Sequence, residues 1–342
     1  MQDPPLPTFV PTSNVQLDGL LDTIREELFI PARLPDKHIR LVYSKKGRKI
    51  LADEPMVVAV GGQDIELKPK DRVLPVRLKM FTQCLDAMTT PEDLDALPDL
   101  VNGFAQSKRK LRNGQLEKMA RLINMRGRID LLMHFTRTAR KETGFVFHRA
   151  LAREFMRGLK MQSALPCKDD ALKGLRYGEQ LLNMLGEPRA KQNPDARLKR
   201  DPVVVGTLLA MFAATAVRFN NGVDHKDTTL DYTHRLKACW KDVEWNQSLD
   251  AQDPSSSWRA KNAVLDYIPV LEGLVTARRL LADKTVMPFL ESESARLNEH
   301  LTVWKDFLDE HTPAGAKKHY GAHSYREVVD DMARRLAAQK PK

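Results

Sequence analysis

Cationic side chains are concentrated between Lys108 and Lys160, and an ordered array of cations can bind the phosphates of a polyanion. This segment holds 15 lysines and arginines against 4 acidic residues, a net charge of +11, whereas the whole 342-residue chain carries +10. The rest of the chain is therefore close to neutral, and the pI of 9.4 has a local origin. A positive field confined to one region favours contact with nucleic acid or another anionic surface.

Four of these cations recur with helical spacing at the end of the segment. They lie at positions i, i+4, i+8 and i+11, and they are Arg149, Arg153, Arg157 and Lys160. Apolar residues such as Leu151 and Phe155 fall on the opposite face of the same helix. The cationic face would span about 16 Å at 1.5 Å per residue, enough for several phosphates along a strand. We call these four residues the α-helical stripe and predict that they are exposed and bind RNA.

The helices that precede the stripe extend the predicted RNA-binding set. Its further members are Lys108, Arg109, Lys110, Arg112, Lys118, Arg121, Arg126 and Arg128. A secondary basic contact is predicted at a hairpin turn formed by Lys45, Lys46, Arg48 and Lys49, although a solvated hairpin tip has the same composition. The alternative for the whole segment is a solvated face whose charges are balanced by carboxylates from neighbouring helices. A net charge of +4 from Gly315 onward suggests another anionic contact at the C-terminus.

Residue patterns for catalysis, metals and cofactors are weak throughout the chain. His319 and His323 are four residues apart, but Gly321 lies between them and no glutamate follows His319 as in a zinc protease. The chain lacks the G-x-G-x-x-G, Walker-type and G-x-S-x-G motifs. The sequence therefore predicts no cofactor, no metal and no catalytic residues.

Regular elements must position the basic segment, and they change type along the chain. Four prolines before Asn14 predict an extended arm that lies on another molecule, followed by a short helix at 15–29. Short β-branched runs from Ile39 to Leu67 predict a small β element of two or three strands. From residue 74 the apolar period becomes 3.6 and predicts helices at about 74–88, 91–112, 115–126, 127–141, 146–162, 169–185, 201–219, 226–243, 258–281, 284–310 and 323–338.

This order of elements predicts a mainly α protein with a small N-terminal β element. Successive helices joined by short turns are typical of helical hairpins, stacked as an irregular α-solenoid of tetratricopeptide or pentatricopeptide type, or as a bundle. The expected domains are an arm and short helix at 1–38, the β element at 39–70, a basic helical domain at 71–190 and a C-terminal helical domain at 191–342.

Cysteine usage and the N-terminal residues bear on the compartment. Three widely spaced cysteines argue against a disulfide framework and for a reducing interior such as the cytoplasm, the nucleus or the mitochondrial matrix. The first 30 residues hold one basic residue, Arg25, against five acids, which is unlike an intact presequence. Either the protein never had a presequence or it has been removed. The most apolar stretch, Val203 to Val217, is shorter than a membrane span, so no membrane insertion is expected.

Three stretches carry a family resemblance. They are Met56 to Pro69, Pro91 to Leu94 and Asp201 to Leu209. These residues resemble helical-repeat-like proteins of filamentous-fungal mitochondria, some of which belong to or attach to the mitochondrial ribosome, and the similarity spans roughly 39–240. The resemblance implies a mitochondrial matrix location, no catalysis, and contacts with ribosomal RNA and neighbouring ribosomal or translation-factor proteins.

Three functions stay open from the sequence. The first is a non-catalytic adaptor that binds structured RNA and proteins, as a component or accessory factor of the mitochondrial translation machinery. The second is a protein–protein scaffold whose basic face meets an acidic partner without RNA. The third is an enzyme whose site is assembled from distant residues, for instance around His134, His148 and Cys167.

Overall fold

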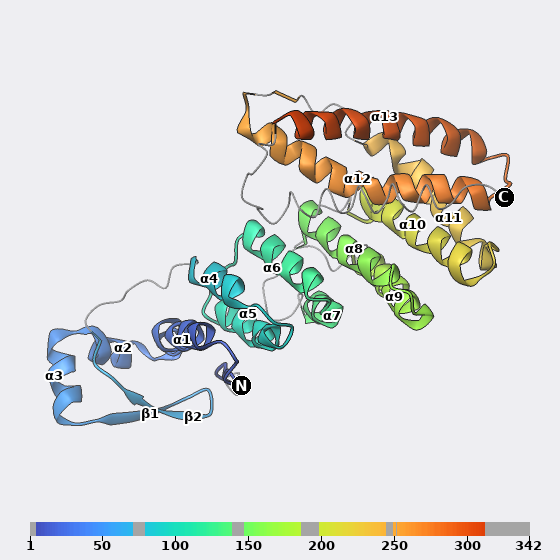
Figure 1. The fold of residues 1–342 in the computed structure, drawn as a ribbon. Helices are drawn as coiled ribbons and strands as arrows, with labels where there is room; N and C mark the ends of the chain where they lie inside the picture. The colour runs from blue at the N-terminus through green and yellow to red at the C-terminus, as the bar shows by residue number, and fades with distance from the viewer. Residues whose placement is uncertain are drawn as a thin grey trace. The chain divides into compact units, whose positions relative to one another are not determined.

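The computed structural model describes residues 5–70, 79–138, 147–185, 198–243, 249–250 and 252–311. The chain forms two compact units, residues 1–147 and residues 148–342. Both are built mainly from helices, and a single two-stranded sheet lies near the N-terminus of the described chain (Figure 1). This confirms the predicted fold class of stacked helical hairpins with a small N-terminal β element. The dividing point differs from the predicted boundary at 190, because the helices from residue 149 onward pack within the second unit.

The proline-rich arm packs on the first unit itself. Leu6 and Pro7 are buried, and the Leu6 amide donates to the Gly61 carbonyl at 3.4 Å. The arm ends at Asn14, whose side chain caps α1 (Val15–Ile24) and also donates to the Ala87 carbonyl at 2.8 Å. The expectation that the arm lies on another molecule is therefore wrong for Leu6 and Pro7, which are buried in the unit's own core, whereas Val10 is 82% exposed.

Residues 36–53 are helical, which corrects the prediction of strands there. The structure has α2 (Asp36–Tyr43) and α3 (Lys45–Asp53), and only β1 (Met56–Val60) and β2 (Gln63–Leu67) pair as an antiparallel hairpin. Ser44 starts α3 by accepting a hydrogen bond from the Gly47 amide at 3.0 Å. Gly47 also allows α2 and α3 to approach closely, since a Cβ there would collide with the Leu41 backbone. The signal for helix was this serine cap, which outweighs the β-branched composition.

The remaining helices of the first unit enclose an aromatic core. After α1 come a π turn (Arg25–Phe29) and a 3-10 turn (Pro31–Arg33), and after the hairpin come α4 (Lys79–Ala87), a 3-10 turn (Glu92–Ala96), α5 (Leu97–Gln106), α6 (Asn113–Met125) and α7 (Ile129–Thr138). Phe104 on α5 makes edge-to-face contacts with Phe29 and Phe81, with ring centroids 5.7 and 5.5 Å apart. The predicted single helix at 91–112 is instead a 3-10 turn followed by α5, and α5 ends at Gln106. The residues 107–112 are consequently free to form a connecting turn.

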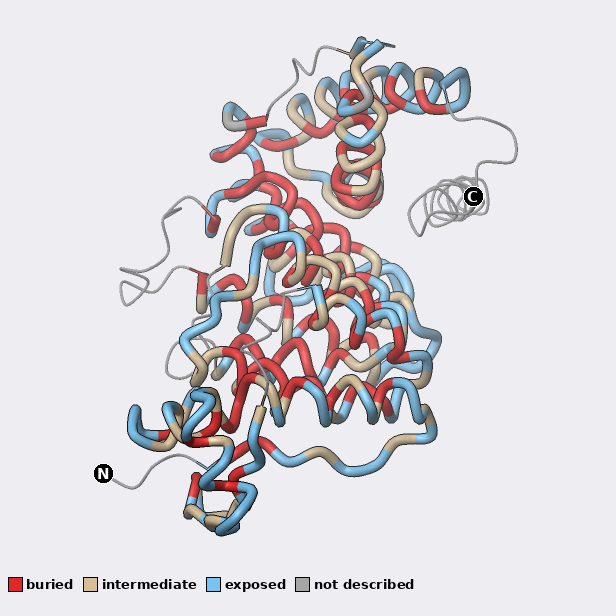
Figure 2. Tube along the Cα trace, turned by 90° about the vertical axis from the view of Figure 1, so that its left-hand side faces the viewer, coloured by how far each residue is buried: buried red, intermediate tan, exposed pale blue. Residues whose placement is uncertain are grey.

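The second unit is built around α10 (Pro202–Phe219). Its other helices are α8 (Arg149–Ser163), α9 (Lys168–Leu185), α11 (Thr228–Cys239), α12 (Pro254–Leu280) and α13 (Met287–His311), with short 3-10 turns at Leu198–Arg200, His225–Asp227 and Trp240–Asp242. α10 packs against α8, α9, α11 and α12, while α13 covers α12. Gly273 on α12 permits close contact, since a Cβ there would press on the α10 backbone at Gly206 and Ala210. In Figure 2, buried residues follow the sides of the helices that face one another.

The apolar character of α10 follows from its central position. By length and composition it is the one helix of the described chain that could cross a membrane, yet 72% of that window is buried inside the protein. Asp201 caps its first turn by accepting hydrogen bonds from the amides of Val203 and Val204. The pattern is that of a core helix enclosed by other helices.

Candidate nucleic-acid interface

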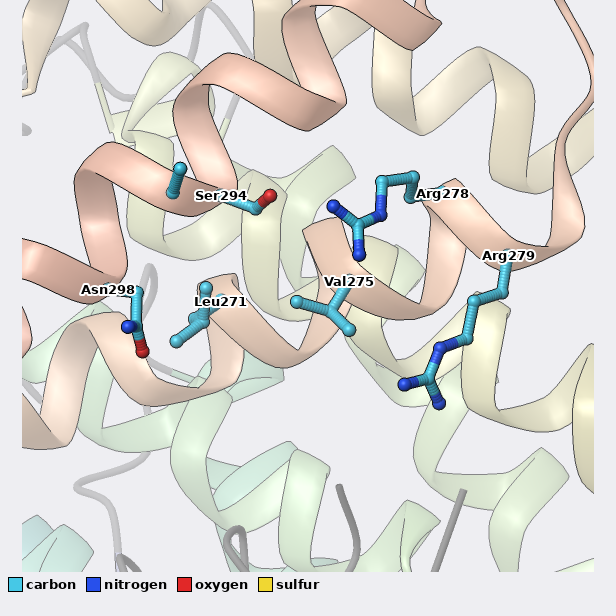
Figure 3. A pocket seen from close by; sticks show the side chains of 7 residues that line it. Leu271, Val275, Arg278, Arg279, Ser294 and Asn298 are labelled. Carbon is cyan, nitrogen blue, oxygen red and sulfur yellow. The ribbon is translucent and has the colours of Figure 1, made fainter. Parts of the chain in front are cut away.

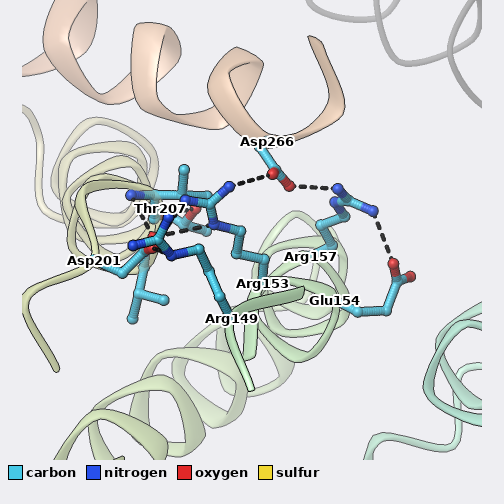
Figure 4. Close-up of polar contacts among 9 residues, drawn as sticks. Arg149, Arg153, Glu154, Arg157, Asp201, Thr207 and Asp266 are labelled. Carbon is cyan, nitrogen blue, oxygen red and sulfur yellow. Dashed lines mark hydrogen bonds and ion pairs between the residues drawn. The ribbon is translucent and has the colours of Figure 1, made fainter. Parts of the chain in front are cut away.

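Arg153, at the centre of the α-helical stripe, points into the second unit. Its guanidinium donates to Asp201 at 2.8 Å and to Asp266 at 2.8 Å (Figure 4). The Arg153 side chain is 16% exposed, and the two carboxylates are 2% and 7% exposed. Burial opposes the charged form of Arg153, but the Coulomb attraction of Asp266 and Asp201 outweighs it and raises the pKa of Arg153. Arg153 is therefore part of a buried ion-pair network.

The other stripe residues join the same or a neighbouring pair. Arg157 bonds Asp266 and also Glu154, the latter at 2.8 Å, and its pKa is raised because these carboxylates outweigh its burial. Arg149 approaches Asp201 at 3.3 Å. Lys160 is buried and bonds Glu272 on α12 at 2.9 Å.

The predicted exposure is therefore wrong for Arg153, Arg157 and Lys160, and the alternative of balancing acids from neighbouring helices is correct for these residues. The Arg149 side chain pairs with Asp201 but stays 38% exposed. The acids come from the α10 N-cap and from α12, 48 to 113 residues away along the chain. An arginine stripe needs such carboxylates to be buried, because an unpaired charge in the interior is strongly unfavourable. Phosphate contact by Arg153, Arg157 and Lys160 is not available without opening the network.

Cations on α6 and after it are partly neutralised within the first unit. Lys118 pairs with Asp86, and Arg128 bonds Asp95 at 2.8 Å and Asp130 at 3.0 Å. The hydrogen bond from Arg128 is the main reason that the pKa of Asp130 is lowered. Two further members of the predicted set, Arg121 and Arg126, are half-buried. These positions offer less positive field to a partner than their sequence suggests.

The connection between α5 and α6 differs from every other part of the predicted set. Its members, which we call the basic turn, are Lys108, Arg109, Lys110 and Arg112. All four are exposed, and none forms an ion pair with an acidic residue in the described part of the chain. The first turn of α6 carries no acidic residue either. Four cations thus lie within five residues at one end of the first unit.

A fifth cation that the sequence reasoning missed, Lys79, is brought to this end by helix packing. Gln115 on α6 contacts Thr82 on α4 at 3.4 Å, and one turn later Lys118 pairs with Asp86. Because both contacts advance in the same direction, α4 and α6 are parallel and their N-terminal ends lie at the same end of the unit. Lys79 is exposed at the first position of α4. Only the three-dimensional pairing of α4 with α6 reveals this addition.

The secondary basic group lies on a helix in place of a hairpin tip. Lys45, Lys46 and Lys49 are exposed on α3, whereas Arg48 is half-buried. The C-terminal cations from Gly315 onward lie outside the described residues. So does the pair His319 and His323.

Other chemistry is weakly supported in the described residues. They contain no group of three or more histidine, cysteine, aspartate or glutamate residues that could hold a metal ion. Burial raises the pKa of the Cys84 thiol to about 12, so this cysteine stays protonated and unreactive. Cys167 is exposed on the α8–α9 connection. Cys84 therefore lacks the thiolate form that nucleophilic catalysis requires.

A shallow groove lies between α12 and α13, with a volume of about 300 Å³ (Figure 3). Leu271 and Val275 form an apolar floor, and Arg278 and Arg279 lie at one end. The lining is completed by Ser294, Ala295 and Asn298. No acid–base pair lies in this lining, and the groove is open to solvent.

A helical-hairpin scaffold with an exposed cluster of cations, here without acidic partners among the described residues, is typical of the basic proteins that assemble with RNA. A family model described as mitochondrial ribosomal protein mS27 matches residues 1–332. The chain therefore belongs to the mitochondrial ribosomal protein mS27 family. It is also 27% identical over 147 residues to the small ribosomal subunit protein mS27 of Neurospora crassa, an alignment that covers 42% of this chain and 37% of the relative.

Family membership confirms the resemblance to proteins of the fungal mitochondrial ribosome. It makes the chain a mitochondrial ribosomal protein, in keeping with the predicted mitochondrial location and role in translation. Ribosomal proteins have structural roles in an assembly, which disfavours the enzyme hypothesis. The aligned part spans less than half of the relative's length.

Proposed function

We propose that this protein is a non-catalytic component of the small mitochondrial ribosomal subunit in the matrix, where the basic turn binds the phosphate backbone of ribosomal RNA. The other helical surfaces would meet neighbouring ribosomal or translation-factor proteins. The observation that carries the proposal is the set of four exposed cations without described acidic partners, on a member of a ribosomal-protein family.

Electrostatics explains why these cations are better candidates than the α-helical stripe. A cation that is already paired must lose its carboxylate before it can bind a phosphate, and a buried pair costs several kcal/mol to separate. Lys108, Arg109, Lys110 and Arg112 have no such cost in the described structure. Contact with a phosphate backbone would also offset the mutual repulsion of four neighbouring positive charges.

Salt dependence of RNA binding tests the proposal. The full chain is titrated with a structured RNA hairpin at several salt concentrations, and compared with a variant carrying glutamine at Lys108, Arg109, Lys110 and Arg112. If each cation neutralises one phosphate, the slope of log affinity against log salt should become shallower by about 3 to 4, at 0.7–0.9 per phosphate.

A matched control removes the same charge from the second unit. It carries glutamine at Arg176, Lys199, Lys284 and Lys305, which are exposed. We expect this control to retain most of the wild-type slope. Equal losses in the two variants would mean that net charge, and not the basic turn, determines binding.

The scaffold alternative predicts a different result in a co-sedimentation assay with mitochondrial small subunits. Under the RNA proposal, nuclease treatment of the subunits releases the protein, and high salt does the same. Retention after nuclease, with release by competing acidic protein, would instead support an acidic protein partner for the basic turn.

A further inference from the structure

Two helices of the first unit end with the same hydrogen-bond pattern. At the end of α5, the Lys108 amide donates to Ala105 at 2.9 Å and the Arg109 amide donates to Phe104 at 2.9 Å. At the end of α6, the Gly127 amide donates to Asn124 at 3.1 Å and the Arg128 amide donates to Ile123 at 3.1 Å. Both are Schellman motifs, in which the residue after the cap adopts the left-handed conformation.

The residue in the left-handed position differs between the two motifs. Gly127 has φ of +68° and Lys108 has φ of +54°. Glycine is the usual residue there because a Cβ atom is strained in this conformation. Lys108 therefore destabilises the end of α5 relative to a glycine. The α6 motif, in which Gly127 takes the same position, shows the turn without this strain.

The surroundings of Lys108 connect this strain with binding. The next residues, Arg109 and Lys110, are both cationic and exposed, and Lys108 has no acidic partner among the described residues. A second lysine with positive φ, Lys226, provides a contrast, because it lies between Asp224 and Asp227 in sequence. A strained residue other than glycine, within a cluster of exposed cations, supports the hypothesis that this residue has a function that offsets its strain.

We propose that the α5 Schellman turn is a phosphate-binding turn in which Lys108 binds a backbone phosphate of RNA at the expense of folding stability. This inference rests on the proposed RNA-binding function and adds its central contact. The left-handed residue reverses the chain at the end of α5, and Arg109 and Lys110 follow it directly, so three cations project from one tight turn. Such a turn suits the closely spaced phosphates of a folded RNA strand.

Three substitutions separate strain from charge. In Lys108→Gln the strain remains and the charge is lost. In Lys108→Gly both are removed. Gly127→Ala calibrates the cost of a Cβ, because nothing lies within 4 Å of the atom that alanine would add.

Binding is measured with the full chain and an RNA hairpin at about 0.15 M salt. Each lost phosphate contact reduces the salt slope by 0.7–0.9, which at this salt concentration corresponds to a roughly four- to sixfold loss of affinity. We expect this loss for both Lys108 variants. Gly127→Ala should bind like the wild type. Stability of the first unit is followed by the rate at which buried Cys84 becomes accessible to alkylation in denaturant.

The stability results should divide the variants differently. Lys108→Gly should lower the unfolding equilibrium constant of the first unit roughly two- to fivefold, Gly127→Ala should raise it by a similar factor, and Lys108→Gln should leave it unchanged. If the wild type binds RNA and both Lys108 variants bind it with the same affinity, this inference is overturned while the proposed function stays intact. Absence of RNA binding by the wild type would overturn the proposed function itself.

The source of the phosphate is tested with two further probes. Vesicles containing 20–30% anionic phospholipid, roughly the content that gives a strongly negative surface, and inorganic phosphate are each titrated against the wild type and Lys108→Gln. We expect the wild type to bind both probes more weakly than it binds RNA, and Lys108→Gln to bind them as the wild type does. Tighter, Lys108-dependent binding to the vesicles would assign the turn to a lipid surface and overturn the RNA assignment.

Discussion

Substitution of Arg153 by methionine tests the buried network most sharply. Methionine keeps much of the side-chain volume and removes the charge, which leaves Asp201 and Asp266 without their shared arginine. Breaking a buried pair by removing one partner typically costs about 3–5 kcal/mol. Here Asp201 keeps Arg149 and two amide donors, and Asp266 keeps Arg157, so we expect a loss near the lower end, about 3 kcal/mol.

Urea unfolding followed by tryptophan fluorescence measures this loss in the second unit alone. All four tryptophans of the chain lie between residues 240 and 304, and Trp304 is 2% exposed. An exposed control, Arg176→Met, should shift the free energy of unfolding by less than about 0.5 kcal/mol. A midpoint for Arg153→Met that matches this control would refute the buried-network reasoning and restore the stripe as a candidate RNA contact.

Contacts and burial in the two units lead to four further predictions. Lys160→Met leaves Glu272 as an unpaired, largely buried charge, whereas the double variant Lys160→Met with Glu272→Met leaves none. The single variant should therefore destabilise the second unit more than the double variant does. Equal losses in urea unfolding would show that the pair is not coupled. Cys167 should react quickly with iodoacetamide in the native protein while Cys84 is protected, and mass spectrometry that finds equal labelling would contradict the burial of Cys84. The raised pKa of Cys84 favours its neutral form in the folded state. The free energy of unfolding should therefore be highest below pH 9 and should fall as the pH approaches 12, by up to about 1.4 kcal/mol per pH unit. Cys84→Ala should flatten this pH dependence in urea titrations. Gly103→Ala should destabilise the first unit by about 1–3 kcal/mol, since the added methyl would overlap the Phe29 ring, and an unchanged thermal midpoint would contradict that packing.

Much of the helical architecture could be predicted because its signals are local. The cap at Asp201 with Pro202 behind it marks the start of α10, and Gly127 ends α6 in the left-handed conformation that its position suggests. The segment 39–51 forms helices where the sequence predicts strands, because its β-branched residues are typical of both a strand and the buried side of a short amphipathic helix. Ser44, in the middle of this segment, was the available cue for a helix cap.

The candidate site could be predicted only in part, because charge balance is not a local property. The α-helical stripe has few acids near it in sequence, yet Asp201 and Asp266 reach it through the packing of α10 and α12 on α8. A charge count along the sequence cannot detect a partner 113 residues away. The basic turn is different, because the sequence predicts it as the end of a helix at 91–112, whereas the structure ends α5 at Gln106 and leaves the four cations exposed on a short connection.

RNA cross-linking in assembled small subunits tests the central claim most directly. The intact subunits are irradiated with ultraviolet light, and peptides that carry cross-linked nucleotides are mapped on this chain by mass spectrometry. We expect cross-links in residues 107–112, with none on the inward face of α8. Cross-links confined to 149–160, with the basic turn unmodified, would contradict the assignment of the RNA contact to the end of α5.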